Sequence, residues 1–218
     1  MIRLDNYTLK YADSIIVENV NLQIDDKDFM AIFGASGIGK SSILNSIIGY
    51  NKPSGGEVLV DDTKVYEVTE KKRFVLRRDY FSFVAQETNL IQSISIMDNV
   101  MLPMRMKKVE CPHNIKEKAE YYLQLLGLEK KINSRINTLS GGEKRRVEIA
   151  RALCNAGRYL LIDEPTENLD AHTADTVADA LKEYHREHGC VVICTHDGRF
   201  VDMATRVMHI EGKQVVEN

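Results

Sequence analysis

The segment GASGIGKSS, residues 34–42, has the residue types and spacing of a phosphate-binding loop. It fits the pattern G-x-x-x-x-G-K-[ST], with an apolar strand pattern before it and a helical pattern after it. Glycines let several backbone N–H groups converge on one anion, and the beginning of a helix adds positive potential. We therefore predict a nucleoside triphosphate site. The residues expected to contact the nucleotide are Gly34, Ala35, Ser36, Gly37, Ile38, Gly39, Lys40, Ser41 and Ser42.

Three side chains of this loop are suited to particular phosphate groups. Lys40 would bring a full positive charge to the β- and γ-phosphates, and Ser42 would reach the α-phosphate. The hydroxyl of Ser41 is a ligand for Mg²⁺. A flexible glycine turn is the alternative, and the flanking strand and helix patterns argue against it.

Two adjacent carboxylates end an apolar strand pattern in YLLIDEP, residues 159–165. A parallel strand that finishes beside the phosphate-binding loop would bring Asp163 near the Mg²⁺ ion. Glu164 would then lie closer to the γ-phosphate, where it could polarise the attacking water as a general base. Acidic residues are also common where strands end in solvent, but a consecutive pair in a chain with this loop favours catalysis.

A second glycine-bearing loop occurs in LSGGEKRRVEIARAL, residues 139–153, and it also leads into a helical pattern. The free N–H groups of Ser140, Gly141 and Gly142 and the helix dipole would attract an anion. The sequence therefore contains two anion-binding loops, although one nucleotide needs only one of them.

The elements that must position these loops follow from the hydrophobic pattern. Residues 1–33 contain short apolar runs typical of strands, and strand patterns alternate with helical ones again after Arg158. Between about Glu87 and Cys154 the pattern is helical. We predict an α/β protein with a mainly parallel sheet, formed by residues 1–86 and 156–218, and an inserted helical subdomain over residues 87–155.

Composition limits the remaining classes of function. The net charge of −3 does not favour nucleic acid as a partner, and no apolar run approaches the roughly 18 residues that span a bilayer. The beginning of the chain does not resemble a secretion signal. Cys190 and Cys194 should share one face of a buried strand, as buried thiols rather than a metal pair; the remaining cysteines are Cys111 and Cys154.

Taken in order, these motifs resemble those of the ATPase subunit of ATP-binding cassette (ABC) transporters over nearly the whole chain. Tyr11 is similar to the aromatic residue that stacks on adenine, and Gln86 in FVAQ to the Q-loop glutamine. LSGGE is similar to the signature loop, LLIDEP to the Walker B strand and ENLD to the D-loop. His196 in CTHD is similar to the switch histidine.

The resemblance explains the second loop. It implies a P-loop NTPase core with an antiparallel N-terminal β region, and a head-to-tail homodimer that encloses two ATP molecules. The signature loop of one subunit would face the γ-phosphate on the P-loop of the other. Asp170 would reach across the same interface, or it would simply cap the following helix. The implied catalytic residues are Glu164, His196 and Gln86, and the implied Mg²⁺ ligands are Ser41, Gln86 and Asp163.

Within the family, the stretch SISIMDNVMLPM and the signature segment most resemble the lipoprotein-release and macrolide-export branch. Three residues depart from the usual pattern: Ile38 and Ser42 in the P-loop, and Glu167, which stands where glycine is common in the branch. None of the three removes a catalytic group.

The resemblance implies a subunit attached to the inner face of the cell membrane through integral membrane permease subunits. It would export or extract a lipidic, peptide or drug-like substrate. The alternative is a mechanical role, in which ATP hydrolysis regulates an extracytoplasmic enzyme without transport. Soluble DNA-maintenance or translation ATPases are disfavoured, because they carry coiled-coil insertions or two cassettes. We also expect Met101 and Met104 to line the groove for the membrane partner.

Overall fold

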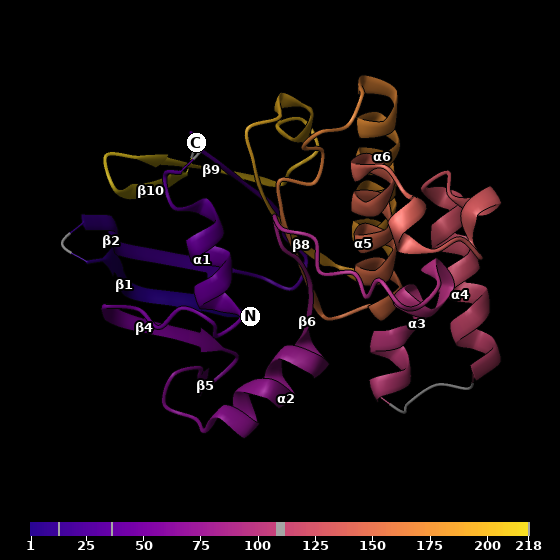
Figure 1. The fold of residues 1–218 in the computed structure, drawn as a ribbon. Coiled ribbons are helices and arrows are strands. Elements are labelled where there is room, and N and C mark those ends of the chain that lie inside the picture. The colour runs from indigo at the N-terminus through magenta and orange to yellow at the C-terminus, as the bar shows by residue number, and fades with distance from the viewer. Residues whose placement is uncertain (13, 36, 108–111, 218) are drawn as a thin grey trace.

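The structure is a computed structural model that describes residues 1–12, 14–35, 37–107 and 112–217 (Figure 1). Ser36 and Cys111, which the sequence analysis singled out, lie outside the described residues. The described chain forms two sheets, six α-helices and three short 3₁₀ helices. The 3₁₀ helices span Glu129–Lys131, Ile136–Thr138 and Gly198–Phe200.

The larger sheet has six strands in the order β10-β9-β3-β8-β7-β6. Strands β3, β6, β7, β8 and β9 are parallel, and β10 pairs with β9 in the antiparallel sense. The strands span Phe29–Phe33 (β3), Phe81–Val84 (β6), Tyr159–Asp163 (β7), Cys190–Thr195 (β8), Arg206–Glu211 (β9) and Gln214–Glu217 (β10). The carboxyl ends of β3 and β7 therefore meet at one edge, as the prediction for Asp163 requires.

The smaller sheet is antiparallel, with strand order β2-β1-β4-β5. Its strands span Ile2–Tyr11 (β1), Ser14–Ile24 (β2), Gly55–Val60 (β4) and Thr63–Lys64 (β5). Together the two sheets confirm the predicted fold class, a mainly parallel sheet with an antiparallel N-terminal β region.

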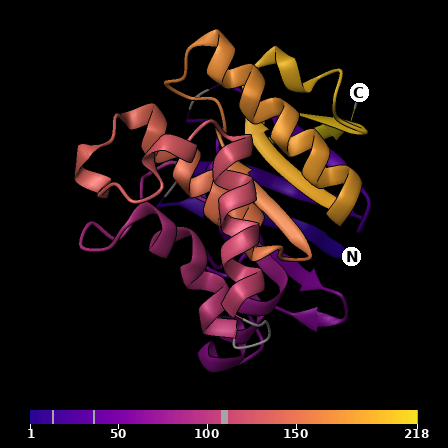
Figure 2. The ribbon, with the colours of Figure 1, turned by 90° about the vertical axis from the view of Figure 1, so that its right-hand side faces the viewer.

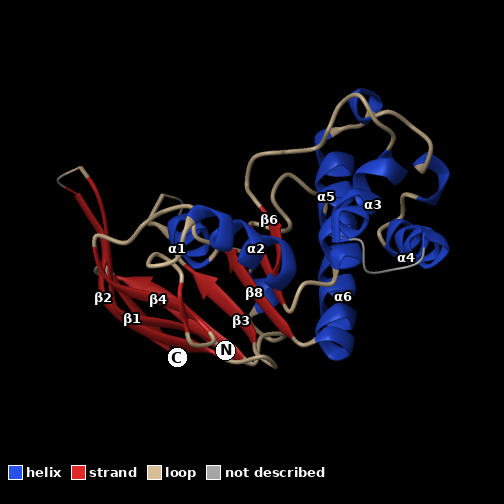
Figure 3. Ribbon diagram, turned by 90° about the horizontal axis from the view of Figure 1, so that it is seen from below, coloured by secondary structure: helices blue, strands red, loops and turns tan. Residues whose placement is uncertain are grey.

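The α-helices are divided between the two sides of the larger sheet. They span Lys40–Ile47 (α1), Glu70–Tyr80 (α2), Ile96–Lys107 (α3), Pro112–Leu125 (α4), Gly141–Asn155 (α5) and Ala171–His188 (α6). Helices α3 to α6 gather on one side of the molecule (Figure 3), and in Figure 2 this side lies in front of the strands. Helix α3 packs against α4 and α5.

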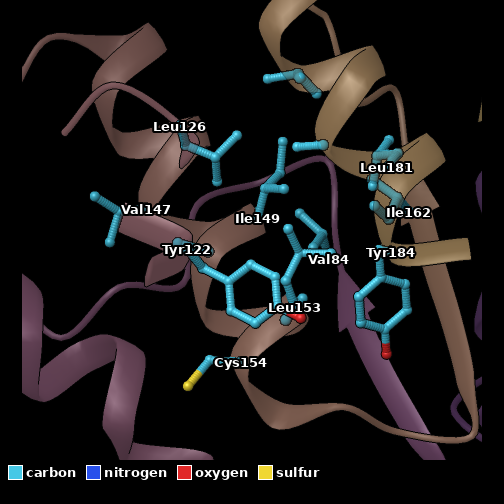
Figure 4. Close-up of a cluster of buried hydrophobic side chains, with 14 of the residues drawn as sticks. Val84, Tyr122, Leu126, Val147, Ile149, Leu153, Cys154, Ile162, Leu181 and Tyr184 are labelled. Carbon is cyan, nitrogen blue, oxygen red and sulfur yellow. The ribbon is translucent and has the colours of Figure 1, made fainter. Parts of the chain in front are cut away.

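Side chains alternate between two hydrophobic cores on the faces of the larger sheet, because successive residues of a strand point to opposite sides. Val191 and Ile193 face the core shared with helices α3 to α6, whereas Cys190 and Cys194 face the core shared with α1 and the smaller sheet. The prediction that both cysteines share one buried face is confirmed. Figure 4 shows part of the first core, where Val84 of β6 lies among residues of the helices.

Helix α4 and the residue after it carry an apolar stripe. Ala119, Tyr122, Leu123 and Leu126 are all buried in the first core. The chain then turns at Gly127, whose φ of +67° is readily adopted only by glycine. The same core joins these residues to the strands of the sheet, so the proposed boundary of the helical subdomain at residues 87–155 stays a prediction.

The expectation that Met101 and Met104 line a docking groove is wrong. Their exposed fractions are 6% and 5%, and both belong to the first core. Helical spacing places Met97, Met101 and Met104 on the same face of α3 as Val100, and that face packs inward. In the described ranges, no helix combines the length and apolarity needed to cross a bilayer.

Candidate nucleotide site

The P-loop connects strand β3 to helix α1. Gly37 and Gly39 have φ values of +79° and +112°, in the region that side chains disfavour. A Cβ atom on Gly39 would also collide with the side chain of Ile16 in β2. Glycine at position 39 therefore allows the sharp turn after which Lys40 begins the helix.

Lys40 is buried and lies between the P-loop and the end of strand β7. Its Nζ atom donates hydrogen bonds to the carbonyl oxygens of Gly34, at 2.7 Å, and Ala35, at 3.2 Å. The same atom lies 3.2 Å from Oε1 of Glu164, and the two side chains are only 5% and 9% exposed. The structure thus brings together a cation and a carboxylate that are distant in sequence.

Glu164 also contacts the residue similar to the switch histidine. Its Oε2 atom lies 3.0 Å from Nδ1 of His196, whose side chain is 64% exposed. The backbone of Glu164 has a φ of +47°, an uncommon value for a residue other than glycine, and its N–H group donates to the carbonyl oxygen of Cys194 at 2.8 Å. The strained turn points the carboxylate toward both Lys40 and His196, as a catalytic site would require.

Asp163 and Ser41 form the part of the site that could hold a cation. Asp163 is buried, and its Oδ1 atom has no hydrogen-bond partner within the described residues. Burial raises the pKa of this carboxyl, the nearby charge of Glu164 adds to the rise, and a hydrogen bond from Ser41 opposes it. Carboxylate and hydroxyl oxygens are preferred ligands of Mg²⁺, so this pair fits the ion.

A cavity of about 140 Å³ lies at the centre of these groups. The residues lining it are Gly37, Gly39, Lys40, Ser41, Ser42, Gln86 and Glu164. The structure therefore brings the P-loop, the Q-loop glutamine and the proposed general base to one place. The Nε2 atom of Gln86 lies 3.4 Å from Oε2 of Glu167, so one of the three departures from the family pattern contacts the Q-loop.

The signature loop lies in a different cavity, of about 410 Å³. Its lining residues are Ser140, Gly141, Gly142, Glu143, Arg146, Asn168, Leu169, Asp170 and Thr173, none of which lines the P-loop cavity. The hydroxyl of Ser140 caps helix α5 by accepting from the N–H group of Glu143 at 3.3 Å. Asp170 caps helix α6 by accepting from the N–H group of Thr173 at 3.0 Å.

Tyr11 lies at the end of strand β1, next to the turn into β2. Its side chain is among the exposed large hydrophobic ones, at 48%, and its hydroxyl accepts a hydrogen bond of 2.7 Å from Asn51. Strand β2 begins at Ser14, which pairs with Tyr11, and contains Ile16 beside the P-loop. The exposed ring leaves room for a planar base, and the stacking of adenine on Tyr11 stays a prediction.

One residue of the site was missed by the sequence analysis. Arg145 of helix α5 is buried and donates hydrogen bonds to the backbone oxygens of Asp163 and, at 3.0 Å, Glu164. The signal in the sequence was weak, because an arginine in the run EKRRVE resembles an exposed helix residue. Only the tertiary fold shows that this arginine points inward.

The chain resembles known proteins over its full length. A model of the ABC transporter family matches residues 17–167. The macrolide export ATP-binding/permease protein MacB of Campylobacter jejuni is 35% identical over 221 residues, which cover 100% of this chain and 34% of that protein. The chain thus spans about a third of the length of its MacB relatives.

A second relative has nearly the same length as this chain. The uncharacterised ABC transporter ATP-binding protein MJ0796 of Methanocaldococcus jannaschii is 36% identical over 223 residues, covering 99% of this chain and 95% of that protein. A dimeric structure of MJ0796 in a post-hydrolysis state, bound to ADP and Pi, superposes with a TM-score of 0.91 at 34% identity, covering 100% of this chain and 98% of that one. The expected resemblance is confirmed: the chain belongs to the ABC transporter family and is one of its ATPase cassettes.

Proposed function

We propose that this cassette hydrolyses ATP within a head-to-tail homodimer and that the cycle of closing and reopening drives a membrane partner. The observation that carries the proposal is the placement of Glu164 between Lys40 and His196, beside the P-loop. The relatives support it, because MJ0796 forms a dimer and retains ADP and Pi after hydrolysis.

In the proposed mechanism, the P-loop binds the triphosphate and Lys40 turns from Glu164 to the β- and γ-phosphates. Glu164 then accepts a proton from the attacking water, and His196 holds this carboxylate and the γ-phosphate in line. Mg²⁺ held by Ser41, Asp163 and Gln86 would neutralise charge on the phosphates. Tyr11 would stack on the adenine ring.

A second subunit would complete each site. Within one chain the signature loop and the P-loop line separate cavities, so Ser140, Gly141 and Gly142 have no nucleotide of their own to bind. In a head-to-tail dimer they would donate to the γ-phosphate of the neighbour, and each charge-assisted hydrogen bond contributes roughly 1.5–3 kcal/mol. Hydrolysis removes the γ-phosphate and with it these contacts, so the dimer reopens.

The membrane partner would dock in a groove of about 510 Å³ between the larger sheet and helix α3. The apolar part of its wall includes Phe74, Ile91 and Met106, which are 49%, 41% and 52% exposed. Arg77, Arg78 and Arg151 also line this groove. An amphipathic helix with apolar anchors and an acidic residue would fit it. With a partner docked in this groove, the cassette would lie on the inner face of the cell membrane.

Our proposal for the substrate class is supported by the relatives alone. MacB is a macrolide export protein in which an ATP-binding part and a permease part share one chain. We propose that the partner of this cassette likewise exports or extracts an amphiphilic substrate, lipidic, peptide or drug-like. Capture of the tagged cassette from native membranes, followed by mass spectrometry of the co-purifying permease, would identify the partner. A partner without a transport pathway would favour the mechanical role.

The Glu164→Gln variant tests the catalytic proposal. It should bind MgATP with wild-type affinity, lose about 10²–10⁴-fold in turnover, and accumulate as a dimer with ATP in sedimentation velocity. Glu129→Gln, at an exposed position in a 3₁₀ helix, is the matched control and should keep wild-type turnover. Wild-type turnover in Glu164→Gln would remove Glu164 from the mechanism. A strictly monomeric, ATP-loaded Glu164→Gln protein would contradict the dimer.

A further inference from the structure

Helix α5 carries a buried ion pair that the mechanism above does not use. Arg145 and Glu148 are 7% and 3% exposed, and Nη1 of Arg145 lies 3.4 Å from Oε2 of Glu148. Both residues lie one turn apart, on the face of the helix that packs against the Q-loop and the end of strand β7. Burying two charges is costly unless their hydrogen bonds are satisfied, so each partner of this pair must be accounted for.

The pair holds both ends of one short segment, residues 85–89, which we call the Q-loop segment. Nη1 of Arg145 donates to the carbonyl oxygen of Ala85 at 2.5 Å. Oε1 of Glu148 accepts from the backbone N–H group of Asn89 at 2.8 Å. Gln86, which lines the nucleotide cavity, lies between these two anchored positions. A shift of this segment must therefore move or break the ion pair.

The other half of the Arg145 guanidinium holds the catalytic turn. Its Nη2 atom donates to the backbone oxygens of Asp163 and Glu164, the latter at 3.0 Å. The planar fork of one arginine thus joins the loop after β6 to the end of β7 and the turn that follows it. A lysine could not make these bonds together, because its ammonium group is a compact donor without a fork.

The Q-loop segment also reaches the groove proposed for the membrane partner. Asn89 lines that groove together with Ile91 and Arg151, and Arg151 donates to the backbone oxygen of Asn89 at 3.3 Å. Asn89 is bonded to Glu148, Glu148 is paired with Arg145, and Arg145 is bonded to the backbone of Glu164. A continuous set of charge-assisted hydrogen bonds therefore links the groove to the proposed general base.

We propose that Arg145 and Glu148 are positioning residues that latch the Q-loop segment to the turn carrying Glu164. The latch fixes Gln86 relative to Glu164, so loosening it should slow hydrolysis. The inference rests on the proposed function, because it assigns positioning residues to the same site. Neither Arg145 nor Glu148 lines the P-loop cavity, so we expect the affinity for ATP to be independent of these two residues.

Steady-state kinetics of four variants test the latch: Arg145→Lys, Glu148→Gln, Glu148→Ala and, as a control, Arg206→Lys. Arg145→Lys and Glu148→Ala should lower kcat about 10- to 100-fold with KM for ATP unchanged within about twofold. Glu148→Gln keeps an oxygen for the Asn89 N–H group and should retain more activity than Glu148→Ala. Arg206 of β9 bonds the backbone oxygen of Gln23 and the carboxylates of Asp28 and Glu217, none of which belongs to this site. Its variant should therefore lower the stability of the protein and leave kcat unchanged.

A fluorescent reporter tests the latch without catalysis. The chain contains no tryptophan, so Glu87→Trp places a single reporter in the exposed part of the Q-loop segment. Val201→Trp places a control at an exposed position outside that segment. Combining either reporter with Arg145→Lys should lower the anisotropy at position 87 and leave that at position 201 unchanged. Unchanged anisotropy at position 87, or kcat that falls only in proportion to the folded fraction, would overturn the latch. A wild-type protein without MgATP hydrolysis would refute the proposed function, and the anisotropy would still test the latch.

Discussion

Nζ of Lys40 lies 3.2 Å from Oε1 of Glu164, and both side chains are buried. The cation expected to hold the phosphates is thus paired with the carboxylate proposed as general base. A lysine contributes one compact charge, so it cannot fully serve both partners. Binding of ATP is therefore expected to draw Lys40 toward the phosphates and to leave Glu164 to His196 and the water.

Because Lys40 and Glu164 are paired, substitutions at the two positions should change the free energy of unfolding non-additively when no nucleotide is bound. Lys40→Met leaves a buried carboxylate with one partner fewer, and should lower the free energy of unfolding by roughly 2–3 kcal/mol. The double variant with Glu164→Gln should be more stable than the sum of the single effects predicts, by about 0.5–3 kcal/mol. Urea denaturation of the four proteins measures this coupling. Additive effects would show that the two groups do not interact in solution.

Because the carboxyl of Asp163 is buried, its negative charge should lower the free energy of unfolding as long as no cation is bound. Because burial raises the pKa of Asp163, the folded protein holds this proton more tightly than the unfolded chain. The free energy of unfolding should therefore fall as the pH rises from the ordinary value of 3.8 through the raised pKa, and the penalty is fully present above it.

Asp163→Asn tests this prediction. The variant should have a higher Tm than the wild type at pH 7 without Mg²⁺, and the difference should shrink as the pH is lowered. Its ATPase activity should fall by at least about 100-fold, since the metal supplies several kcal/mol of charge stabilisation. Asp62→Asn, at an exposed turn, should change neither quantity. A lower Tm for Asp163→Asn at pH 7 would contradict the assignment.

A substitution at Gly141 in the signature loop should impair dimerisation and leave folding intact. A Cβ atom on Gly141 meets nothing within 4 Å in the described part of the chain, so Gly141→Ala should change stability by less than about 1 kcal/mol. In the proposed dimer the added methyl would stand at the γ-phosphate of the neighbour. We expect the variant to bind ATP normally and to lose the ATP-dependent dimer about 10- to 100-fold.

Sedimentation of Gly141→Ala in the Glu164→Gln background measures this loss, and nucleotide binding is followed by calorimetry. Gly142→Ala is the comparison, because its methyl group would lie 3.0 Å from Cδ2 of Leu169 within the same chain. It should lose some stability as well as the dimer. An intact ATP dimer of Gly141→Ala would place the signature loop away from the nucleotide.

Two methionines of α3, Met104 and Met106, differ in exposure, and substituting each of them tests where the partner docks. Met106 is 52% exposed and lines the groove, whereas Met104 is 5% exposed and belongs to the core. Met106→Asp should keep the Tm and the ATPase activity of the isolated cassette and should abolish capture of the permease from membranes. Met104→Asp buries a charge without a partner and should prevent stable folding. Normal capture by Met106→Asp would move the docking site elsewhere.

Local patterns in the sequence determined the fold class and most of the candidate site. The strand, P-loop and helix around Lys40 and the acidic end of β7 were predicted correctly as elements, because each depends on residues within one turn or one strand. The conformation of such a segment is set by glycine freedom, side-chain alternation and helical spacing, all of which are readable over a few residues.

The tertiary structure decided which side chains meet across the chain. Lys40 and Glu164 are paired, and Arg145 bonds two separate segments of the backbone. Met104 is buried, although we expected it to line a docking surface. These contacts depend on how the sheets and helices pack, and the direction of a long side chain on a polar helix is not encoded in its neighbours in sequence. The physical reason is that burial and charge pairing are set by distant segments, whereas strand, turn and helix formation are largely local.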